Sequence, residues 1–278
     1  MRQILIPTDF SQNSWNAIQY ALQFFKTDDV IFHFLHITTV QNAIKTDDLY
    51  SAGISRSKSE ISNAHLEMDE LIGQVTSGHS KNNFQYKSAI VPSLFIDGIR
   101  SYIEHNAIEL VVMGTKGASG IKEITVGSKT GAVITKVKCP ILVIPEKAKF
   151  KTPLQIGFPT DFNLHYNHKV IETLLSMAQI YSSSIKVLRV AQAQKPLTEF
   201  QSVNRDFLKE QFQGVGHSFH LVEGANLENT LQSFVTSMKI DMVAMIAKNL
   251  NFFQQILFKP KVAKLSYHML VPFLVLHE

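Results

Sequence analysis

The chain has 278 residues, of which 45% are hydrophobic and 18% charged, and a formal net charge of +4. This composition is typical of a folded globular protein and excludes a disordered chain, and the length suggests about two domains. No apolar run approaches the roughly 18 residues of a membrane span, and the apolar start Ile4–Ile6 is shorter than a signal-peptide core. Cys139 is the only cysteine, so an internal disulfide is impossible and we expect a protein of the reducing cytoplasm.

The charge is distributed unevenly between the two halves of the sequence. Residues 1–146 hold 13 basic and 14 acidic residues, whereas residues 147–278 hold 14 basic and 9 acidic residues. A nucleic-acid-binding protein gathers its basic residues on one face or stripe, but here they are scattered. We therefore predict no nucleic-acid partner, and we interpret the short basic run Lys147–Lys151 as a solvated linker.

The first half alternates between apolar strands and amphipathic helices. In chain order, strands are expected at residues 2–6, 30–37, 84–91, 109–113 and 141–144. Ser11 and Ser93 are candidate N-caps of the first and third helices. The second helix is marked by a stripe of apolar residues at three- and four-residue spacing together with one histidine, namely Ile61, His65, Met68, Leu71, Ile72 and Val75.

This alternation predicts the α/β class, with a parallel sheet covered by helices on both faces. In such a fold a ligand binds at the carboxyl ends of the strands, where the strand order changes direction. Residues that directly follow a strand are therefore the first candidates for a site.

The same unit occurs twice along the chain. Ile4–Phe10 returns as Ile156–Phe162, and residues 108–146 align without a gap on residues 240–278 with ten identities. The offset is 152 at the front and 132 at the back, so the first repeat carries about 20 extra residues within residues 41–87. We predict two tandem α/β domains, residues 1–147 and 153–278, each with an open five-stranded sheet.

The chemistry is concentrated in one glycine-rich segment between Gly114 and Ser128. Glycines let a backbone approach a phosphate closely, and the amide groups at a helix start favour an anion. Neither the dinucleotide-binding spacing of glycines nor the phosphate loop of motor-type ATPases is present. Candidate phosphate-binding residues are the glycines and the nearby hydroxyl and basic residues, namely Gly114, Lys116, Gly117, Gly127, Ser128, Lys129 and Thr130.

The spacing Gly114-x2-Gly117-x9-Gly127-Ser128 resembles the nucleotide-binding signature of the universal stress protein family. The segments Pro7-Thr8-Asp9 and Cys139–Pro145 resemble the two ends of the same family's domain, so the whole chain resembles a tandem two-domain member. The resemblance implies Rossmann-like five-stranded parallel sheets of the adenine nucleotide alpha hydrolase type. It also implies fifth strands that pair between the domains as an internal pseudo-dimer, and further homodimerisation.

In the nucleotide-binding branch of the family, ATP lies between the ends of the first and fourth strands. Carried over by position, the segment at Pro7 would bring Thr8 and Asp9 to the base and ribose, and Ile37 would line the adenine pocket. Met113 and Gly114 would flank the ribose and the α-phosphate. The remaining positions would surround the phosphates, with Mg²⁺ as a possible companion ion, namely Lys116, Gly117, Gly127, Ser128, Lys129 and Thr130. Asp9 has an alternative role, which is to cap the following helix.

The second repeat departs from this pattern. It keeps Pro159, Thr160 and Asp161, but Ile246, Asn249, Lys259 and Pro260 replace the two glycines after the fourth strand and the Gly-Ser pair before the last helix. Proline has no amide hydrogen to donate to a phosphate. We therefore expect that the second half does not bind a nucleotide in the manner of the first half. The apolar loop between Asn249 and Lys259 would pack inside the molecule or at an interface, or form a different pocket.

Three functions remain open from the sequence. The first is an ATP-binding regulatory module that acts on an unknown protein partner. The second is a slow ATPase or autophosphorylating protein, with Ser128 or Thr130 as acceptor. The third is a nucleotide-free scaffold that acts through the second repeat. No residue is assigned a catalytic role or a metal-binding role, His36 is interpreted as a strand-end histidine, and Cys139 is interpreted as buried and inert.

Overall fold

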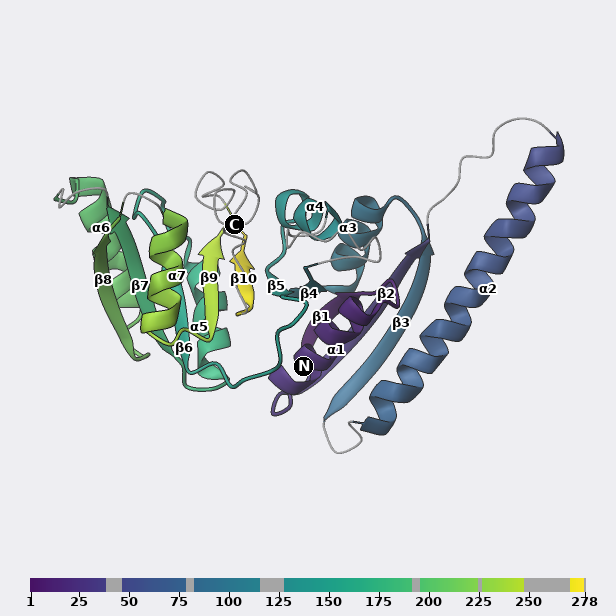
Figure 1. Cartoon of the computed structure of the whole chain (residues 1–278), viewed down its shortest axis with the longest axis horizontal. Coiled ribbons are helices and arrows are strands. Elements are labelled where there is room, and N and C mark those ends of the chain that lie inside the picture. Colours follow the sequence, from purple (N-terminus) through teal and green to yellow (C-terminus); the bar gives the residue numbers. More distant parts are fainter. Residues whose placement is uncertain are drawn as a thin grey trace.

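A computed structural model describes residues 1–38, 47–78, 83–115, 128–191, 196–224, 227–247 and 271–277 of the chain. The fold is α/β, as predicted, and its strands form one ten-stranded sheet with the order β3-β2-β1-β4-β5-β10-β9-β6-β7-β8 (Figure 1). None of the helices in the described segments is long and apolar enough to cross a membrane.

Each half of the chain contributes five strands. The first half contains β1 (Arg2–Pro7), α1 (Gln12–Phe24), β2 (Val30–Thr38), α2 (Asp47–Gly78), β3 (Phe84–Pro92), α3 (Phe95–Asn106), β4 (Leu110–Gly114), α4 (Ser128–Lys136) and β5 (Ile141–Ile144). The second half contains β6 (Gln155–Pro159), α5 (His168–Gln179), β7 (Ser184–Ala191), α6 (Glu199–Gln211), β8 (His217–Glu223), α7 (Leu227–Ser237), β9 (Met242–Ile246) and β10 (Phe273–Leu276).

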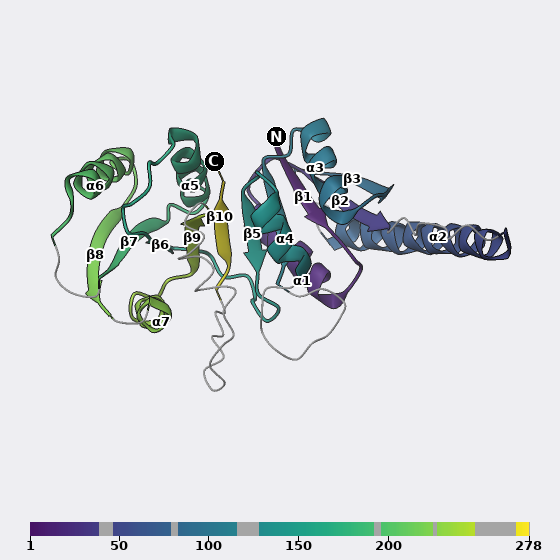
Figure 2. The same ribbon diagram turned by 90° about the horizontal axis from the view of Figure 1, so that it is seen from above.

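The two five-strand groups meet at the pair β5–β10, the predicted pairing of fifth strands. Within each group the strands are parallel, whereas β5 and β10 are antiparallel, with Leu142 opposite Leu274 and Ile141 opposite Val275. Figure 2 shows the two strands side by side in the middle of the molecule. Each strand therefore covers a sheet edge that would otherwise be open to pairing with another chain.

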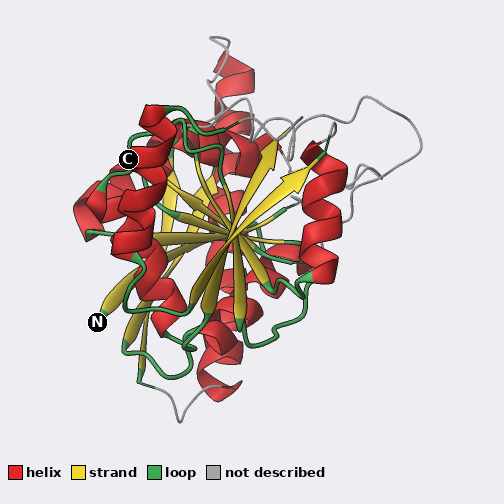
Figure 3. Cartoon of the chain, turned by 90° about the vertical axis from the view of Figure 1, so that its left-hand side faces the viewer, coloured by secondary structure: helices red, strands yellow, loops and turns green. Residues whose placement is uncertain are grey.

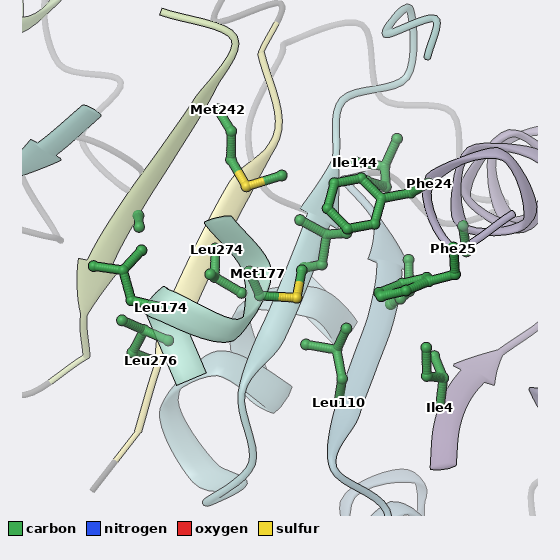
Figure 4. Packing of buried hydrophobic residues seen from close by; sticks show 14 of the residues in the cluster. Ile4, Phe24, Phe25, Leu110, Ile144, Leu174, Met177, Met242, Leu274 and Leu276 are labelled. Carbon is green, nitrogen blue, oxygen red and sulfur yellow. The ribbon is translucent and has the colours of Figure 1, made fainter. Parts of the chain in front are cut away.

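Helices cover both faces of the sheet (Figure 3). The helices α1, α2, α5 and α6 contribute to one hydrophobic cluster, and α3, α4 and α7 contribute to the other. The first cluster runs without a break across the β5–β10 pair, from Phe24 and Ile144 to Leu274 and Met177 (Figure 4). The two halves consequently share one core, and burial of this apolar surface favours their association.

The extra residues of the first repeat lie largely in one helix. Helix α2 has 32 residues, whereas α6, which has the same place in the second repeat, has 13. Among the residues of α2 whose side chains are described, the buried stripe consists of Ala64, Met68, Leu71 and Val75. The inclusion of His65 in that stripe was wrong, because the helical turn points this residue to solvent and brings the neighbouring Ala64 into the core.

The two predicted N-caps have different outcomes. Ser11 does cap α1, and its side chain accepts a hydrogen bond from the Ser14 amide. Ser93 does not cap α3, whose N-cap is Leu94 without a side-chain bond. The Ser93 amide instead donates to the Thr38 carbonyl at 3.1 Å, which ties this residue to the end of β2.

The segment between the repeats is more than a solvated linker. Lys147, Lys149 and Lys151 are exposed as predicted, but Ala148 is buried and Phe150 is half-buried. The Phe150 ring lies 5.5 Å from the ring of Tyr20 and 6.0 Å from that of Tyr181, between centroids. The linker is therefore anchored on both repeats.

Candidate functional site

A tight turn joins β1 to α1 at the carboxyl end of the first strand. The Thr8 hydroxyl accepts the amide hydrogen of Phe10 at 3.0 Å, and Phe10 has a left-handed backbone with φ of 58°. The Asp9 carboxylate accepts hydrogen bonds from the Ser11 hydroxyl at 2.6 Å and from the Ser11 amide at 3.3 Å. Asp9 thus supports the helix start through the capping residue rather than by capping the helix itself.

The end of β2 forms a second wall beside this turn. The His36 ring stacks on Phe10, with centroids 4.6 Å apart, and its Nδ1 donates to the Thr8 carbonyl at 2.9 Å. This agrees with the interpretation of His36 as a satisfied strand-end histidine. Ile37 follows it and, like His36, is partly exposed.

The end of β4 and the start of α4 are joined by one hydrogen bond. The buried Thr130 hydroxyl donates to the Gly114 carbonyl at 2.7 Å. Helix α1 passes close by, because a Cβ placed on Gly114 would overlap the side-chain amide of Asn13. A glycine at this position therefore leaves room for the Asn13 side chain at the start of α1.

The amino end of α4 brings positive charge to the same place. Lys129 is exposed, and its ammonium group lies 5.3 Å from the centroid of the Phe95 ring. The unpaired amide groups and the dipole of a helix start add partial positive charge. This end of the sheet is therefore suited to an anionic group.

These elements line a small, partly open pocket of about 50 Å³. Its lining comes from the ends of β1, β2 and β4 and from α1, α3 and α4, and consists of Pro7, Thr8, Asp9, Ser14, His36, Ile37, Phe95, Met113, Gly114, Lys129 and Thr130. Apolar side chains and a few polar groups converge in it, as in small-molecule sites generally.

Eight of the twelve predicted site residues line this pocket. They are Pro7, Thr8, Asp9, Ile37, Met113, Gly114, Lys129 and Thr130. Ser128 begins α4 and is exposed, outside this lining. Lys116, Gly117 and Gly127 lie outside the described residues.

Three lining residues were missed from the sequence. Ser14 lies in the first turn of α1, and its hydroxyl is 3.1 Å from that of Thr8. His36 was noticed only as a strand-end residue, although it directly precedes Ile37. Phe95 is the first residue of α3 and was interpreted only as part of the apolar face of that helix. No local sequence signal indicated that its ring would line the pocket.

Comparisons with known proteins agree with this geometry. The sequence profile of the universal stress protein family matches residues 1–145. The chain belongs to the universal stress protein family. It is 29% identical over 161 residues to the universal stress protein MJ0577 of Methanocaldococcus jannaschii, covering 52% of this chain and 96% of the relative. A second protein of that organism, the universal stress protein MJ0531, is 26% identical over 148 residues, covering 53% of this chain and 84% of the relative.

The likeness in fold extends over both repeats. The crystal structure of a universal stress protein from Archaeoglobus fulgidus DSM 4304 matches 98% of this chain and 97% of its own, with a TM-score of 0.69. The sequences are 14% identical, so this likeness concerns the fold alone. A universal stress protein fold thus accounts for the whole ten-stranded arrangement.

The second repeat keeps the turn that lines the pocket of the first repeat, but a larger side chain lies beside this turn. The Thr160 hydroxyl accepts from the Phe162 amide at 3.1 Å, and Phe162 has a φ of 61°, as in the first repeat. The position of Ser14 is taken by Tyr166, which is buried and whose hydroxyl lies 2.5 Å from that of Thr160.

Helix α6 closes the same turn from the other side. The Gln201 side chain donates to the Asp161 carbonyl at 2.8 Å, and the Asn204 side chain donates to the Phe162 carbonyl at 2.9 Å. Ile246, which replaces Gly114, is buried. Asn249, Lys259 and Pro260 lie outside the described residues.

Cys139 lies apart from the pocket. Its thiol is buried and is 3.7 Å from the Ile108 carbonyl. Burial, followed by the charge of Glu109, raises the pKa of this thiol to about 12. The thiolate is therefore disfavoured, in agreement with the prediction of an inert cysteine.

Proposed function

We propose that the first repeat binds an adenine nucleotide, with ATP the expected ligand, and that the protein is a nucleotide-controlled regulatory module. One observation carries the proposal: Thr8, Ile37, Gly114 and Lys129, which are far apart in the sequence, line one pocket. The pocket lies at the carboxyl ends of parallel strands, where α/β folds bind their ligands.

The residues present suit the parts of a nucleotide. Ile37 offers apolar surface to a base, Thr8 and Asp9 offer polar groups to the base and ribose, and Met113 lies where it would flank the ribose and the α-phosphate. Lys129 and the amino end of α4 offer positive charge to phosphates. The bound nucleotide would supply charge and shape to the loop between Gly114 and Ser128, whose state a partner protein would recognise.

The two repeats would then have different tasks. Residues 1–147 would form the nucleotide-binding domain, and residues 153–278 would form a degenerate domain without nucleotide bound in this manner. Tyr166 and Ile246 support this division, because larger side chains occupy the positions of Ser14 and Gly114.

Binding is favoured over efficient hydrolysis. ATP hydrolysis needs a positioned water, a base and metal ligands. Asp9 is the one carboxylate among the described residues that line the pocket, and it already accepts two hydrogen bonds from Ser11. Bound Mg²⁺ would therefore depend largely on the phosphates themselves.

The proposal is tested on purified full-length protein. Mass spectrometry of the small molecules released on denaturation should find an adenine nucleotide, and calorimetry should measure ATP binding. Gly127→Lys, which copies Lys259 of the second repeat, should abolish the affinity and leave the circular dichroism spectrum unchanged. No released nucleotide together with no heat of ATP binding would favour the nucleotide-free scaffold, and turnover above background would favour the slow ATPase.

The expected homodimer and the cytoplasmic location also remain proposals. The β5 edge is already paired with β10, so a homodimer would form through another surface. Light scattering of the purified protein measures the oligomeric state. The single cysteine supports the reducing cytoplasm.

A further inference from the structure

Two side chains hold the carboxyl end of α4, the helix whose amino end forms part of the pocket. Arg100 of α3 donates to the Lys136 carbonyl through Nε at 2.9 Å and Nη2 at 2.5 Å. His277 donates through Nε2 to the Ile134 carbonyl at 2.7 Å. Carbonyl groups in the last turn of a helix have no partner within the helix, so both bonds satisfy groups that need an outside donor.

His277 reaches α4 from the second repeat. It follows β10, and the antiparallel register that pairs Val275 with Ile141 carries it toward Cys139, just after the end of α4. A carbonyl oxygen only accepts hydrogen bonds, so Nε2 carries the proton in this contact. Burial lowers the pKa of His277, which favours the neutral ring, with Nδ1 as the nitrogen without a proton.

The matching position of the first repeat cannot make this contact. The residue that aligns with His277 in the first repeat is Pro145, which has no side-chain donor. The pairing of fifth strands therefore does not by itself require such a bond. Among the described residues, the bond is made toward the repeat that carries the glycine-rich segment.

Helix α4 connects this contact with the pocket over a single turn. Thr130 precedes Ile134 by four residues, so the two residues lie on the same face of the helix. The Thr130 hydroxyl binds the Gly114 carbonyl, and Lys129 lines the pocket beside it. A shift of the carboxyl end of α4 would consequently move the groups that face the pocket.

We propose that His277 is a positioning residue, supplied by the second repeat, which holds α4 in the orientation that the nucleotide site of the first repeat requires. The inference rests on the proposed function as far as the nucleotide is concerned. The second repeat then does more than cover the β5 edge, because it sets the affinity of its neighbour's site.

The test compares His277→Ala and His277→Gln with the wild type, all as full-length protein, and uses His65→Ala at an exposed position as the matched control. Glutamine keeps an N–H donor near the position of Nε2. In His277→Ala we expect faster hydrogen exchange of the α4 amides than in wild type, without a general increase elsewhere. The dissociation constant for ATP should rise roughly three- to thirty-fold. His277→Gln should restore most of both properties, and His65→Ala should change neither.

The two readouts separate this inference from the proposed function. Wild-type protein that binds no nucleotide overturns the proposed function and the link to affinity, while hydrogen exchange still reports whether His277 holds α4. Unchanged exchange in α4 and unchanged ATP affinity in His277→Ala overturn the inference alone. Exchange that rises equally over the whole chain also overturns it, because the residue would then act on global stability.

Discussion

The phenol hydroxyl of Tyr181 donates a hydrogen bond to the Phe24 carbonyl at 2.8 Å, and the Gln23 carbonyl lies 3.2 Å from the same oxygen. The donor belongs to the second repeat, whereas both acceptors lie at the carboxyl end of α1 in the first. Helix α1 is thus capped from the other half of the molecule. Together with Phe150 of the linker, this contact fixes the two repeats to each other outside the sheet.

Tyr181→Phe removes this hydroxyl and leaves the ring in place. We expect the free energy of unfolding to fall by about 1 kcal/mol, because the end of α1 loses its outside donor. Urea denaturation measures the loss, and the slope of the unfolding free energy against urea concentration should equal that of the wild type. Tyr86→Phe is the control, since the buried Tyr86 hydroxyl has no hydrogen-bond partner among the described residues. That variant should be neutral or more stable, and equal losses in both would contradict the capping role.

A second prediction concerns the close approach of Asn13 and Gly114. In Gly114→Ala the new methyl group would collide with the Asn13 amide, and we expect a loss of about 1–3 kcal/mol in the free energy of unfolding. Asn13→Ala removes the colliding atoms, so the double variant should lose less than the sum of the two single variants. A double-mutant cycle by urea denaturation measures this coupling.

The control for the cycle is Gly73→Ala in α2. A Cβ at Gly73 would meet no atom within 4 Å, so the substitution should stabilise the helix by up to about 1 kcal/mol. Strict additivity of Asn13→Ala and Gly114→Ala would contradict the interpretation that the glycine serves this approach.

The sequence predicted the repeat and the α/β class because these follow from periodic and repeated signals, whereas the pairing of β5 with β10 was expected only from the resemblance to the universal stress protein family. The same signals place Thr8 and Gly114 at strand ends, so their meeting in one pocket follows from the parallel topology. Details that depend on one turn of helix did not follow. Apolar spacing alone does not decide whether His65 or Ala64 faces the core. A serine before a helix caps it only where its backbone occupies the N-cap position, which in α3 belongs to Leu94.

The remaining lining residues depend on side-chain contacts that form only when the strand ends and the turns beside them have folded. Ser14 enters the pocket because its hydroxyl turns toward Thr8, and His36 does so because Phe10 adopts a left-handed backbone and stacks on it. No local pattern encodes either contact. The role of Tyr166 was missed for the same reason, because only the folded structure shows its hydroxyl beside that of Thr160.

Lys129 should contribute charge rather than shape to the nucleotide site. In Lys129→Gln we expect the affinity for ATP to fall roughly tenfold, whereas the affinity for adenosine should stay the same, because only ATP carries phosphates. The loss should shrink as the salt concentration rises. Calorimetry with both ligands measures the two effects.

Lys136→Gln is the matched control for this charge. Lys136 lies on the same helix but at its carboxyl end, away from the described pocket lining. It should leave both affinities unchanged. If Lys129→Gln lowered the affinity for adenosine as much as the affinity for ATP, Lys129 would shape the pocket rather than bind phosphates.

His33 is a fully buried histidine with a partner on each ring nitrogen. Its Nε2 lies 2.7 Å from the Gln3 amide oxygen, and its Nδ1 lies 3.1 Å from the Tyr102 hydroxyl. The amide oxygen only accepts, so Nε2 donates to it, and Nδ1 accepts from the phenol. Burial, with a smaller effect of the charge on Lys87, lowers the pKa of His33 to about 4.

This lowered pKa predicts a loss of stability in acid. The unfolded chain takes up a proton near the ordinary histidine pKa of about 6.5, whereas the folded chain does so near 4, so the contribution of His33 is complete above pH 6.5 and declines between pH 6.5 and 4. At pH 5 the wild type should have lost about 2 kcal/mol more, relative to pH 7.5, than His33→Gln. Urea denaturation at both pH values measures the difference, with the exposed His105→Gln as control. A pH dependence in His33→Gln equal to that of the wild type would show that the buried histidine is not the group that titrates.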